Sequence, residues 1–306
     1  MRVVIALGGN ALLERGEKPD ADIQQEHVVS AVRALAPLAR SHKLVITHGN
    51  GPQVGVLALE SARDPDLSRP YPFDVLGAQT QGMIGYWLVQ ALSDALPGTP
   101  ACCLLCRTVV WADDPAFATP SKFVGPVYEE AQARQLAAAR GWAIAQDGHA
   151  WRRVVPSPEP IQVVETEMIA QLAGSGTMVV CAGGGGIPVV RDESGALRGV
   201  EAVVDKDLTA SLLGRVLVAD ALVILTDVDA VQDGYGTPQA RPIRQTTPRE
   251  LRARSFPAGS MRPKVEVACR FVEETGGMAA IGRLDDAEAL LERKAGTIIT
   301  DDPGRR

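Results

Sequence analysis

The sequence has few of the side chains from which protein metal sites are usually built. Its 306 residues include only four histidines and five cysteines, and the histidines show no paired ligand spacing. Three of the cysteines, Cys102, Cys103 and Cys106, fall within an apolar run that is typical of a buried strand. We therefore predict free thiols and no structural zinc.

Long apolar runs are also missing. No run approaches the roughly 20 residues that a helix needs to cross a bilayer. The first residues resemble a strand, whereas a secretory signal begins with a basic region followed by an apolar segment. A formal net charge of -6 argues against a basic face that would bind nucleic acid. We expect a cytoplasmic protein with neither a membrane nor a nucleic-acid partner.

Lysine is scarce, because only six of the 31 basic residues are lysines and arginine is the usual cation. Lys122, Lys206 and Lys264 stand beside proline, glycine or aspartate. Since lysine carries a compact charge on a flexible stem, these positions are candidates for a site that needs such a charge. The other lysines are predicted to be exposed on the surface.

Glycine, by contrast, is plentiful at the ends of three strand-like runs. The runs 2–7, 43–47 and 178–181 are followed by Gly8 and Gly9, by Gly49 and Gly51, and by Gly183 to Gly186. Glycines let a ligand approach the backbone, and a following helix start attracts anions. A glycine pair can also simply turn the chain, so the first run alone leaves both interpretations open. Three such ends predict an anion-binding crevice at the carboxyl edge of a parallel sheet.

Strand-like and helix-like patterns alternate along the chain, which favours an α/β fold with a mostly parallel sheet and helices on both faces. Helices are predicted over 22–42 and 73–96, a helix start directly after Asn10, and a strand over 102–110. A further apolar strand, 221–226, leads into Asp227.

The segment 111–160 is too long for a connection and too poor in apolar residues for a core of its own. We predict a small protruding subdomain with Lys122 near its tip. The alternative is a surface insertion in which that lysine is incidental. A domain border is expected near residue 204. Just beyond it, Asp205 and Asp207 flank Lys206, where they can either cap a helix or take part in chemistry.

The chain contains no Ser/His/Asp or Cys/His arrangement, no GxxxxGK[ST] loop and no protein-kinase catalytic loop. Glycine loops combined with lysines and strand-end aspartates fit phosphoryl transfer, which mainly requires donors and cations placed around the moving group.

Eight short motifs follow one another in the order found in one enzyme family. They are GGNAL at 8–12, HGNGPQVG at 48–55, QTQGMIGY at 79–86, PSKFVGP at 120–126, CAGGGGIPV at 181–189, GVEAVVDKD at 199–207, LTDVDAV at 225–231 and GSMRPKVE at 259–266. Together they resemble the carbamate kinases of the amino acid kinase superfamily over essentially the whole chain.

The resemblance implies a three-layer αβα sandwich, a homodimer, and reversible phosphoryl transfer between MgATP and carbamate that gives MgADP and carbamoyl phosphate. It implies an N-terminal lobe, 1–204, which binds carbamate or carbamoyl phosphate and carries a lid subdomain at about 111–160. A C-terminal lobe, 205–306, would bind the nucleotide. Relatives that act on acylated amino acids have a lysine where this chain has Asn10, and the resemblance implies that Lys122 supplies the missing charge.

The resemblance also assigns site residues, with ATP or ADP as cosubstrate, Mg²⁺ as cofactor and no fixed protein ligand to the metal. The catalytic residues would be Lys122, Lys206, Lys264 and Asp207. The substrate-binding residues would be Gly8, Gly9, Asn10, Gly49, Asn50, Gly51, Gly184 and Gly185. The nucleotide-binding residues would be Asp227, Val228, Tyr235, Gly259, Ser260, Met261 and Lys264. Arg262 departs from the family pattern, which usually has glycine there.

Two other interpretations remain open at this point. Another small-acid kinase of the superfamily would need more room for its substrate and usually the other lysine arrangement. A non-catalytic ligand sensor could keep the fold and lose turnover, although all three lysines and Asp207 are present.

Overall fold

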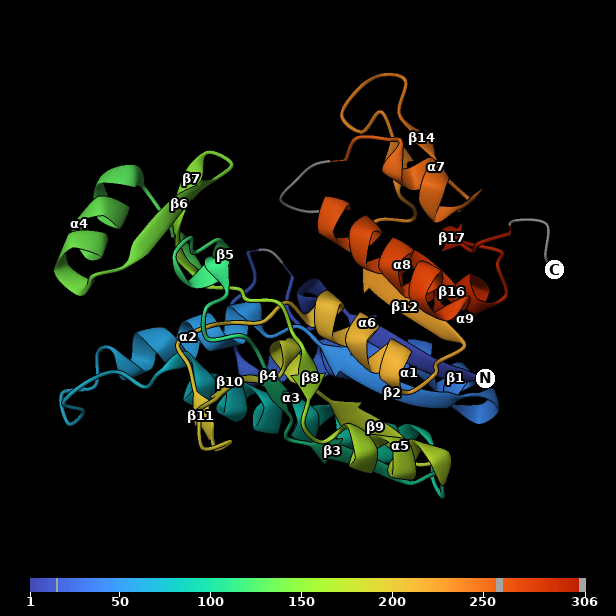
Figure 1. Ribbon diagram of the computed structural model, residues 1–306, viewed down its shortest axis with the longest axis horizontal. Helices are drawn as coiled ribbons and strands as arrows, with labels where there is room; N and C mark the ends of the chain where they lie inside the picture. Colours follow the sequence, from blue (N-terminus) through green and yellow to red (C-terminus); the bar gives the residue numbers. More distant parts are fainter. Residues whose placement is uncertain (15, 257–260, 303–306) are drawn as a thin grey trace.

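The computed structural model describes residues 1–14, 16–256 and 261–302, and its largest sheet runs through the middle of the molecule (Figure 1). Within the described residues this sheet has eight strands. Adjacent strands run parallel to each other, except β16 and β17, which are antiparallel. In spatial order the strands are β15 (Gln245–Thr246), β17 (Thr297–Ile299), β16 (Met278–Arg283), β12 (Ala221–Thr226), β1 (Arg2–Leu7), β2 (Lys43–His48), β9 (Met178–Cys181) and β3 (Ala101–Leu104).

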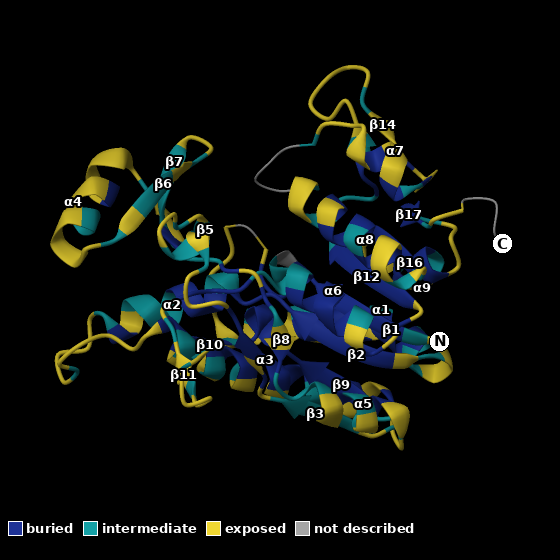
Figure 2. Cartoon of the chain, viewed as in Figure 1, coloured by how far each residue is buried: buried dark blue, intermediate teal, exposed yellow. Residues whose placement is uncertain are grey.

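Helices cover both faces of this sheet. Successive side chains of its central strands point to opposite faces, so they enter two different cores. In β1, Val4 and Ala6 join one core while Val3, Ile5 and Leu7 join the other. The first core is completed by α5 (Thr166–Gly174), α6 (Lys206–Val216), α7 (Pro248–Arg252) and α8 (Met261–Thr275). The second is completed by α1 (Ala21–Ser41), α3 (Phe73–Ala95) and α9 (Ala287–Leu291). The expected three-layer αβα sandwich is therefore confirmed, with the buried strands between the helices (Figure 2).

The two long helices predicted from the sequence are confirmed as α1 and α3. In α3, the small residue Gly85 allows a close contact with β3, because a Cβ at this position would overlap the sulfur of Cys103. This part of the helix is thus an internal seam. No helix in the described part of the chain is long and apolar enough to cross a membrane.

The helix start predicted directly after Asn10 is wrong. The chain makes one 3₁₀ turn, η1 (Gly9–Ala11), and the next helix begins only at Ala21. After Leu12 and Leu13 the intervening residues are polar and include a glycine and a proline, so they offer no continuous apolar stripe with which a helix could pack.

The strand predicted over 102–110 is two strands. β3 stays in the large sheet, while β4 (Arg107–Val109) joins a second sheet with β8 (Gln162–Val163), β10 (Ile187–Arg191) and β11 (Leu197–Gly199). At the break, the side-chain amide of Gln81 accepts from Cys106 N at 2.9 Å and donates to Cys106 O at 3.1 Å. A buried side chain from α3 therefore satisfies the N–H of Cys106 at the break, and it shares the Cys106 carbonyl with Ile187 N of β10.

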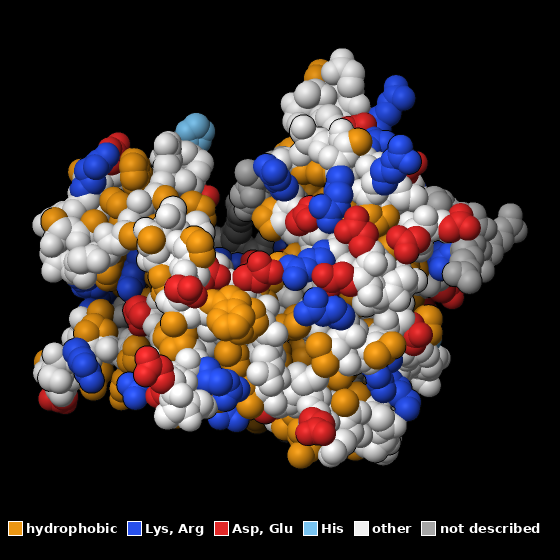
Figure 3. Space-filling model, in the orientation of Figure 1, with side chains coloured by type: hydrophobic (Ala, Val, Ile, Leu, Met, Phe, Trp, Pro, Cys, Tyr) orange, Lys and Arg blue, Asp and Glu red, His pale blue; other side chains and the backbone are white. Residues whose placement is uncertain are grey.

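The segment predicted as a protruding subdomain stands out from the rest of the molecule (Figure 1). It contains a three-stranded antiparallel sheet, β5 (Lys122–Tyr128), β7 (Ala150–Val155) and β6 (Ala143–Asp147), and the helix α4 (Glu130–Arg140). The short turn η2 (Pro115–Phe117) lies in the same segment, before β5. Figure 3 shows the surface hollowed between this subdomain and the region of α7 and α8.

The prediction that Lys122 lies near the tip of the subdomain is wrong, because it lies at the base. Lys122 is the first residue of β5, and this strand packs against α2 (Gly51–Ser61). Gly55 of α2 faces Gly125 of β5 so closely that a Cβ on Gly55 would overlap the Gly125 backbone. Two glycines therefore bring the subdomain's first strand against the body of the protein.

The remaining elements are short. The strands β13 (Gln232–Asp233) and β14 (Arg241–Pro242) form a small antiparallel pair after β12. The turns η3 (Gly183–Gly185) and η4 (Leu284–Asp286) follow β9 and β16.

Candidate active site

The three glycine-rich strand ends meet at one edge of the large sheet, since β1, β2 and β9 are parallel neighbours. A Cβ added to Gly49 would lie 2.9 Å from Gly9 N, and one added to Gly184 would overlap the amide of Asn50. Gly8 is similarly close to β12, because its Cβ would lie 2.9 Å from Leu225 O. The structure thus joins these loops into one backbone-lined surface.

The loop after β9 turns through conformations that favour glycine. Gly184, Gly185 and Gly186 have φ values of 64°, 88° and 90°. The loop is held from outside, because Gly185 O accepts hydrogen bonds from the hydroxyls of Thr108 at 2.7 Å and Thr209 at 3.0 Å. It is therefore an ordered part of the site.

The loop after β2 is also fixed by hydrogen bonds. Asn50 Nδ2 donates to Thr80 Oγ1 at 2.8 Å, and that hydroxyl donates to Gly77 O at 2.9 Å. The imidazole of His48 is buried, and its Nδ1 lies 3.0 Å from Gly49 O. Burial lowers the pKa of His48 to about 4, so the ring is neutral at pH 7.

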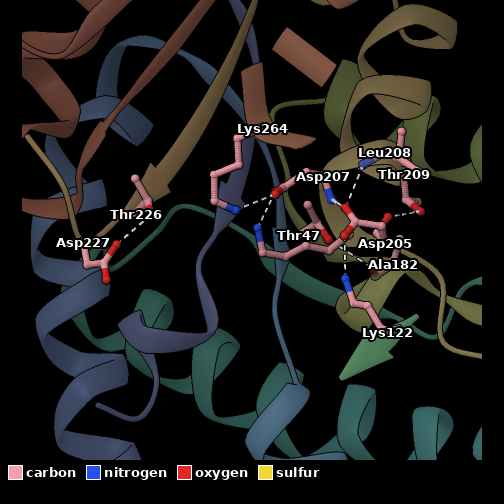
Figure 4. Close-up of polar contacts among 11 residues, drawn as sticks. Thr47, Lys122, Ala182, Asp205, Asp207, Leu208, Thr209, Thr226, Asp227 and Lys264 are labelled. Atoms are coloured by element: carbon pink, nitrogen blue, oxygen red, sulfur yellow. Dashed lines mark hydrogen bonds and ion pairs between the residues drawn. The ribbon is translucent and has the colours of Figure 1, made fainter. Parts of the chain in front are cut away.

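Beside these loops, α6 begins with a cluster of lysines and aspartates (Figure 4). Asp207 accepts hydrogen bonds from Lys206 Nζ at one oxygen and from Lys264 Nζ, at 2.8 Å, at the other. Asp205 pairs with Lys122 Nζ at 2.5 Å. Lysines from three distant parts of the chain are thereby brought to the start of one helix.

The opposite charges in this cluster stabilise one another's ionised forms. Burial alone would raise the pKa of Asp207, but the Lys206 and Lys264 charges lower it below its usual range. Burial would likewise raise the pKa of Asp205, and the Lys122 charge lowers it well below that range. Burial lowers the pKa of Lys206, whereas for Lys264 the attraction of Asp207 outweighs burial and raises the pKa. Both carboxyl groups are therefore ionised at neutral pH.

A cavity of about 570 Å³ opens between the loop after η1, the start of α2, and β5. Lysines and glycines line its walls. The predicted site residues in this lining are Gly9, Gly49, Asn50, Gly51, Lys122, Gly184 and Lys206. Gly8 and Gly185 do not line the cavity; Gly8 lies against Leu225, and Gly185 lies against Val204, which does line it. The backbone of Asn10 belongs to η1.

The residues predicted to bind the nucleotide are spread over several elements and do not form one cluster. Asp227 follows β12 and accepts from Thr226 Oγ1 at 3.1 Å, and it lies close enough to Lys264 to help raise the pKa of that lysine. Met261 begins α8, the helix that carries Lys264. Val228 is half-buried, and Tyr235 is 65% exposed in the loop after β13. Gly259 and Ser260 lie outside the described residues.

The sequence interpretation left the role of Asp205 open between capping and chemistry, and the structure shows both a cap and a contact with Lys122. The signal in the sequence was the Asp-Lys-Asp run at a helix start. Its partner could not be read from the sequence, because Lys122 lies 83 residues away.

Comparisons with known proteins agree with this arrangement. The sequence profile of the "Amino acid kinase family" matches residues 1–281 of this chain. A carbamate kinase of Rhizobium meliloti (strain 1021) is 52% identical, with 98% of this chain and 93% of that protein covered. One of Escherichia coli (strain K12) is 49% identical, with 97% and 99% covered.

Solved structures show the same similarity. The carbamate kinase from Giardia lamblia bound to AMP-PNP has a TM-score of 0.90 and 39% identity, with 98% of each chain covered. The same enzyme bound to citric acid gives a TM-score of 0.92. A family match over most of the chain, together with relatives of about 50% identity over nearly its full length, shows that this protein belongs to the amino acid kinase family.

Proposed function

We propose that the protein is a carbamate kinase, which transfers a phosphoryl group reversibly between ATP and carbamate. The observation that carries the proposal is the cluster of Lys122, Lys206 and Lys264 around two ionised aspartates at the glycine-lined edge. Positive charge concentrated at one point suits a group whose oxygens gain negative charge during transfer. The full-length similarity to carbamate kinases supports the choice of substrate.

Carbamate would bind in the cavity at Gly49, Asn50 and Gly51, where backbone N–H groups and a fixed amide can orient a small planar acid. The remaining substrate-binding proposals are Gly8, Gly9, Asn10, Gly184 and Gly185. Lys206 and Lys264, held by Asp207, would neutralise the phosphoryl oxygens from one side. Lys122 would do so from the subdomain, which also helps to exclude water.

The nucleotide would lie on the other side of the cluster. Asp227, Val228, Tyr235 and Met261, with Gly259 and Ser260, are the proposed contacts. In this assignment residues 1–204 form the acceptor lobe, with 111–160 as its lid, and 205–306 form the nucleotide lobe.

Mg²⁺ is proposed to arrive with the nucleotide. Among the residues that the structure describes, no group of three or more His, Cys, Asp or Glu side chains could hold a metal ion. The carboxylates nearest the cluster, Asp205 and Asp207, are paired with lysines. Both observations fit an ion held mainly by phosphate oxygens and water, where it would supply further charge neutralisation.

The direct test is ATP formation from carbamoyl phosphate and ADP by the purified protein. We expect turnover that depends on Mg²⁺ and stops in excess chelator. Absence of ATP formation at millimolar substrate, or turnover unchanged by the chelator, would contradict the proposal. We also propose a homodimer in the cytoplasm, and light scattering after gel filtration tests the oligomeric state.

A further inference from the structure

The two carboxylate oxygens of Asp205 serve different elements (Figure 4). Oδ1 accepts from the backbone N–H of Asp207 at 2.9 Å and of Leu208 at 3.3 Å, so it caps α6. Oδ2 accepts from Lys122 Nζ at 2.5 Å. A single side chain thus connects the catalytic helix start with the first residue of β5.

The cap alone does not require an aspartate. Serine or asparagine caps a helix about as well, and either has an oxygen for the exposed N–H groups. The second oxygen of Asp205 makes its hydrogen bond to the ammonium group of Lys122, and the charge of Asp205 also attracts the more distant Lys206 and Lys264. The pair is sheltered, with side-chain exposures of 33% for Lys122 and 24% for Asp205, so its attraction is less screened than that of an open surface pair.

Lys122 has reason to need such a partner. Its side chain has four rotatable bonds, and without a partner the ammonium group would sample many positions. Among the described residues, Asp205 is the one carboxylate that pairs with Lys122. Asp207 is occupied by Lys206 and Lys264, so it does not fill this role.

We propose that Asp205 is a positioning residue for phosphoryl transfer, which acts by holding Lys122 Nζ at the site with Oδ2 while Oδ1 fixes the start of α6. The proposal rests on the proposed function for its kinetic consequence, although the contact itself does not. In this role Asp205 does not touch the substrate. It sets the distance between the lysine of the subdomain and the two lysines of the body.

The test compares Asp205→Asn with Asp205→Ser. Both variants keep an oxygen for the cap, but the asparagine turns its amide donors toward the Lys122 ammonium and the serine does not reach it. We expect kcat to fall roughly 10- to 100-fold in both, as for one partner of a close charge pair, with KM for ADP changed less than about 3-fold.

The same substitutions in a Lys122→Ala background separate positioning from structure. If Asp205 acts through Lys122, Asp205→Asn changes kcat less than about 3-fold once that lysine is gone. An equal fall in both backgrounds would overturn the proposal, since it would assign the loss to the cap or to another contact.

Hydrogen exchange on the substrate-free protein supplies a readout that does not depend on activity. In Asp205→Asn we expect faster exchange in 121–124, at the start of β5, and unchanged exchange in the first turn of α6. Faster exchange confined to α6 would overturn the proposal by showing that Asp205 is only a cap. If the wild type makes no ATP, the proposed function fails, and this measurement still decides whether Asp205 holds Lys122.

Discussion

The side chain of Lys264 links two helices, because it lies on α8 and forms an ion pair with Asp207 on α6. We expect Lys264→Ala to lower kcat roughly 100- to 1,000-fold, the loss typical of one preorganised charge at a reacting group. The matched control is Lys294→Ala, which removes an exposed lysine paired with Glu292. Steady-state ATP formation and a thermal melt measure both variants.

The control variant should keep the turnover and the melting temperature of the wild type, since exposed ion pairs contribute little to stability. If Lys264→Ala also kept near-normal turnover and melted with the wild type, Lys264 would be a structural charge at a helix start and nothing more.

His48 makes the stability depend on pH. Its pKa is about 4 in the folded protein, against the 6.5 of an unperturbed histidine, so between these values the unfolded chain binds the extra proton. The stabilisation from keeping the ring neutral is present above pH 6.5 and is lost as the pH falls toward 4. It amounts to about 3 kcal/mol for a shift of this size.

The measurement is urea unfolding at pH 7 and pH 4 for the wild type and for His48→Gln, which cannot titrate. Carboxyl groups titrate alike in both proteins and cancel in the comparison. We expect the wild type to lose about 3 kcal/mol more than the variant. Equal losses would show that His48 is not buried as a neutral ring.

The sequence identified the three lysines of the site because lysine is rare in this chain and each has an unusual neighbour. It could not place Lys122 at the base of the subdomain, nor pair it with Asp205. That contact depends on how β5 packs against α2, which is decided by two glycines far apart in the sequence and by no local pattern.

At the scale of elements, the contact between α2 and β5 controls where the subdomain begins. Gly55→Ala adds a Cβ that overlaps the Gly125 backbone. We expect a cost of about 1 to 3 kcal/mol in stability and a fall in kcat, because β5 must move and Lys122 moves with it. Chemical unfolding and ATP formation measure the two effects.

Gly174→Ala provides the control, since this glycine ends α5, is exposed and has no atom within 4 Å of an added Cβ. Alanine there should be neutral or stabilising by up to about 1 kcal/mol. Gly55→Ala behaving like this control would mean that the two elements separate at no cost.

Most elements could be predicted from apolar periodicity and glycine position, including α1, α3 and the strand ends of the site. The break between β3 and β4 could not, because the run 102–110 contains no glycine or proline at which a strand would be expected to end. At the break the amide of Gln81 bonds both backbone groups of Cys106, and a contact from a side chain 25 residues away has no local signature.

At the scale of the whole molecule, β1 lies between β2 from the first half of the chain and β12 from the second. A chain ending at residue 204 would leave Val3 to Leu7 as an apolar, unpaired edge. We expect this fragment to aggregate or remain unfolded, as judged by gel filtration and circular dichroism. A monomeric fragment that unfolds cooperatively would show that the proposed acceptor lobe folds independently.

The place of β1 in the sheet also imposes an order on biosynthesis. Val3 pairs with Ala221, so the second edge of the first strand stays open until more than two-thirds of the chain has been made. At translation rates of about 5 to 20 residues per second, β1 waits roughly 10 to 45 seconds for β12. During that time the nascent chain carries an apolar strand edge without its second neighbour, and such an edge can pair with other chains.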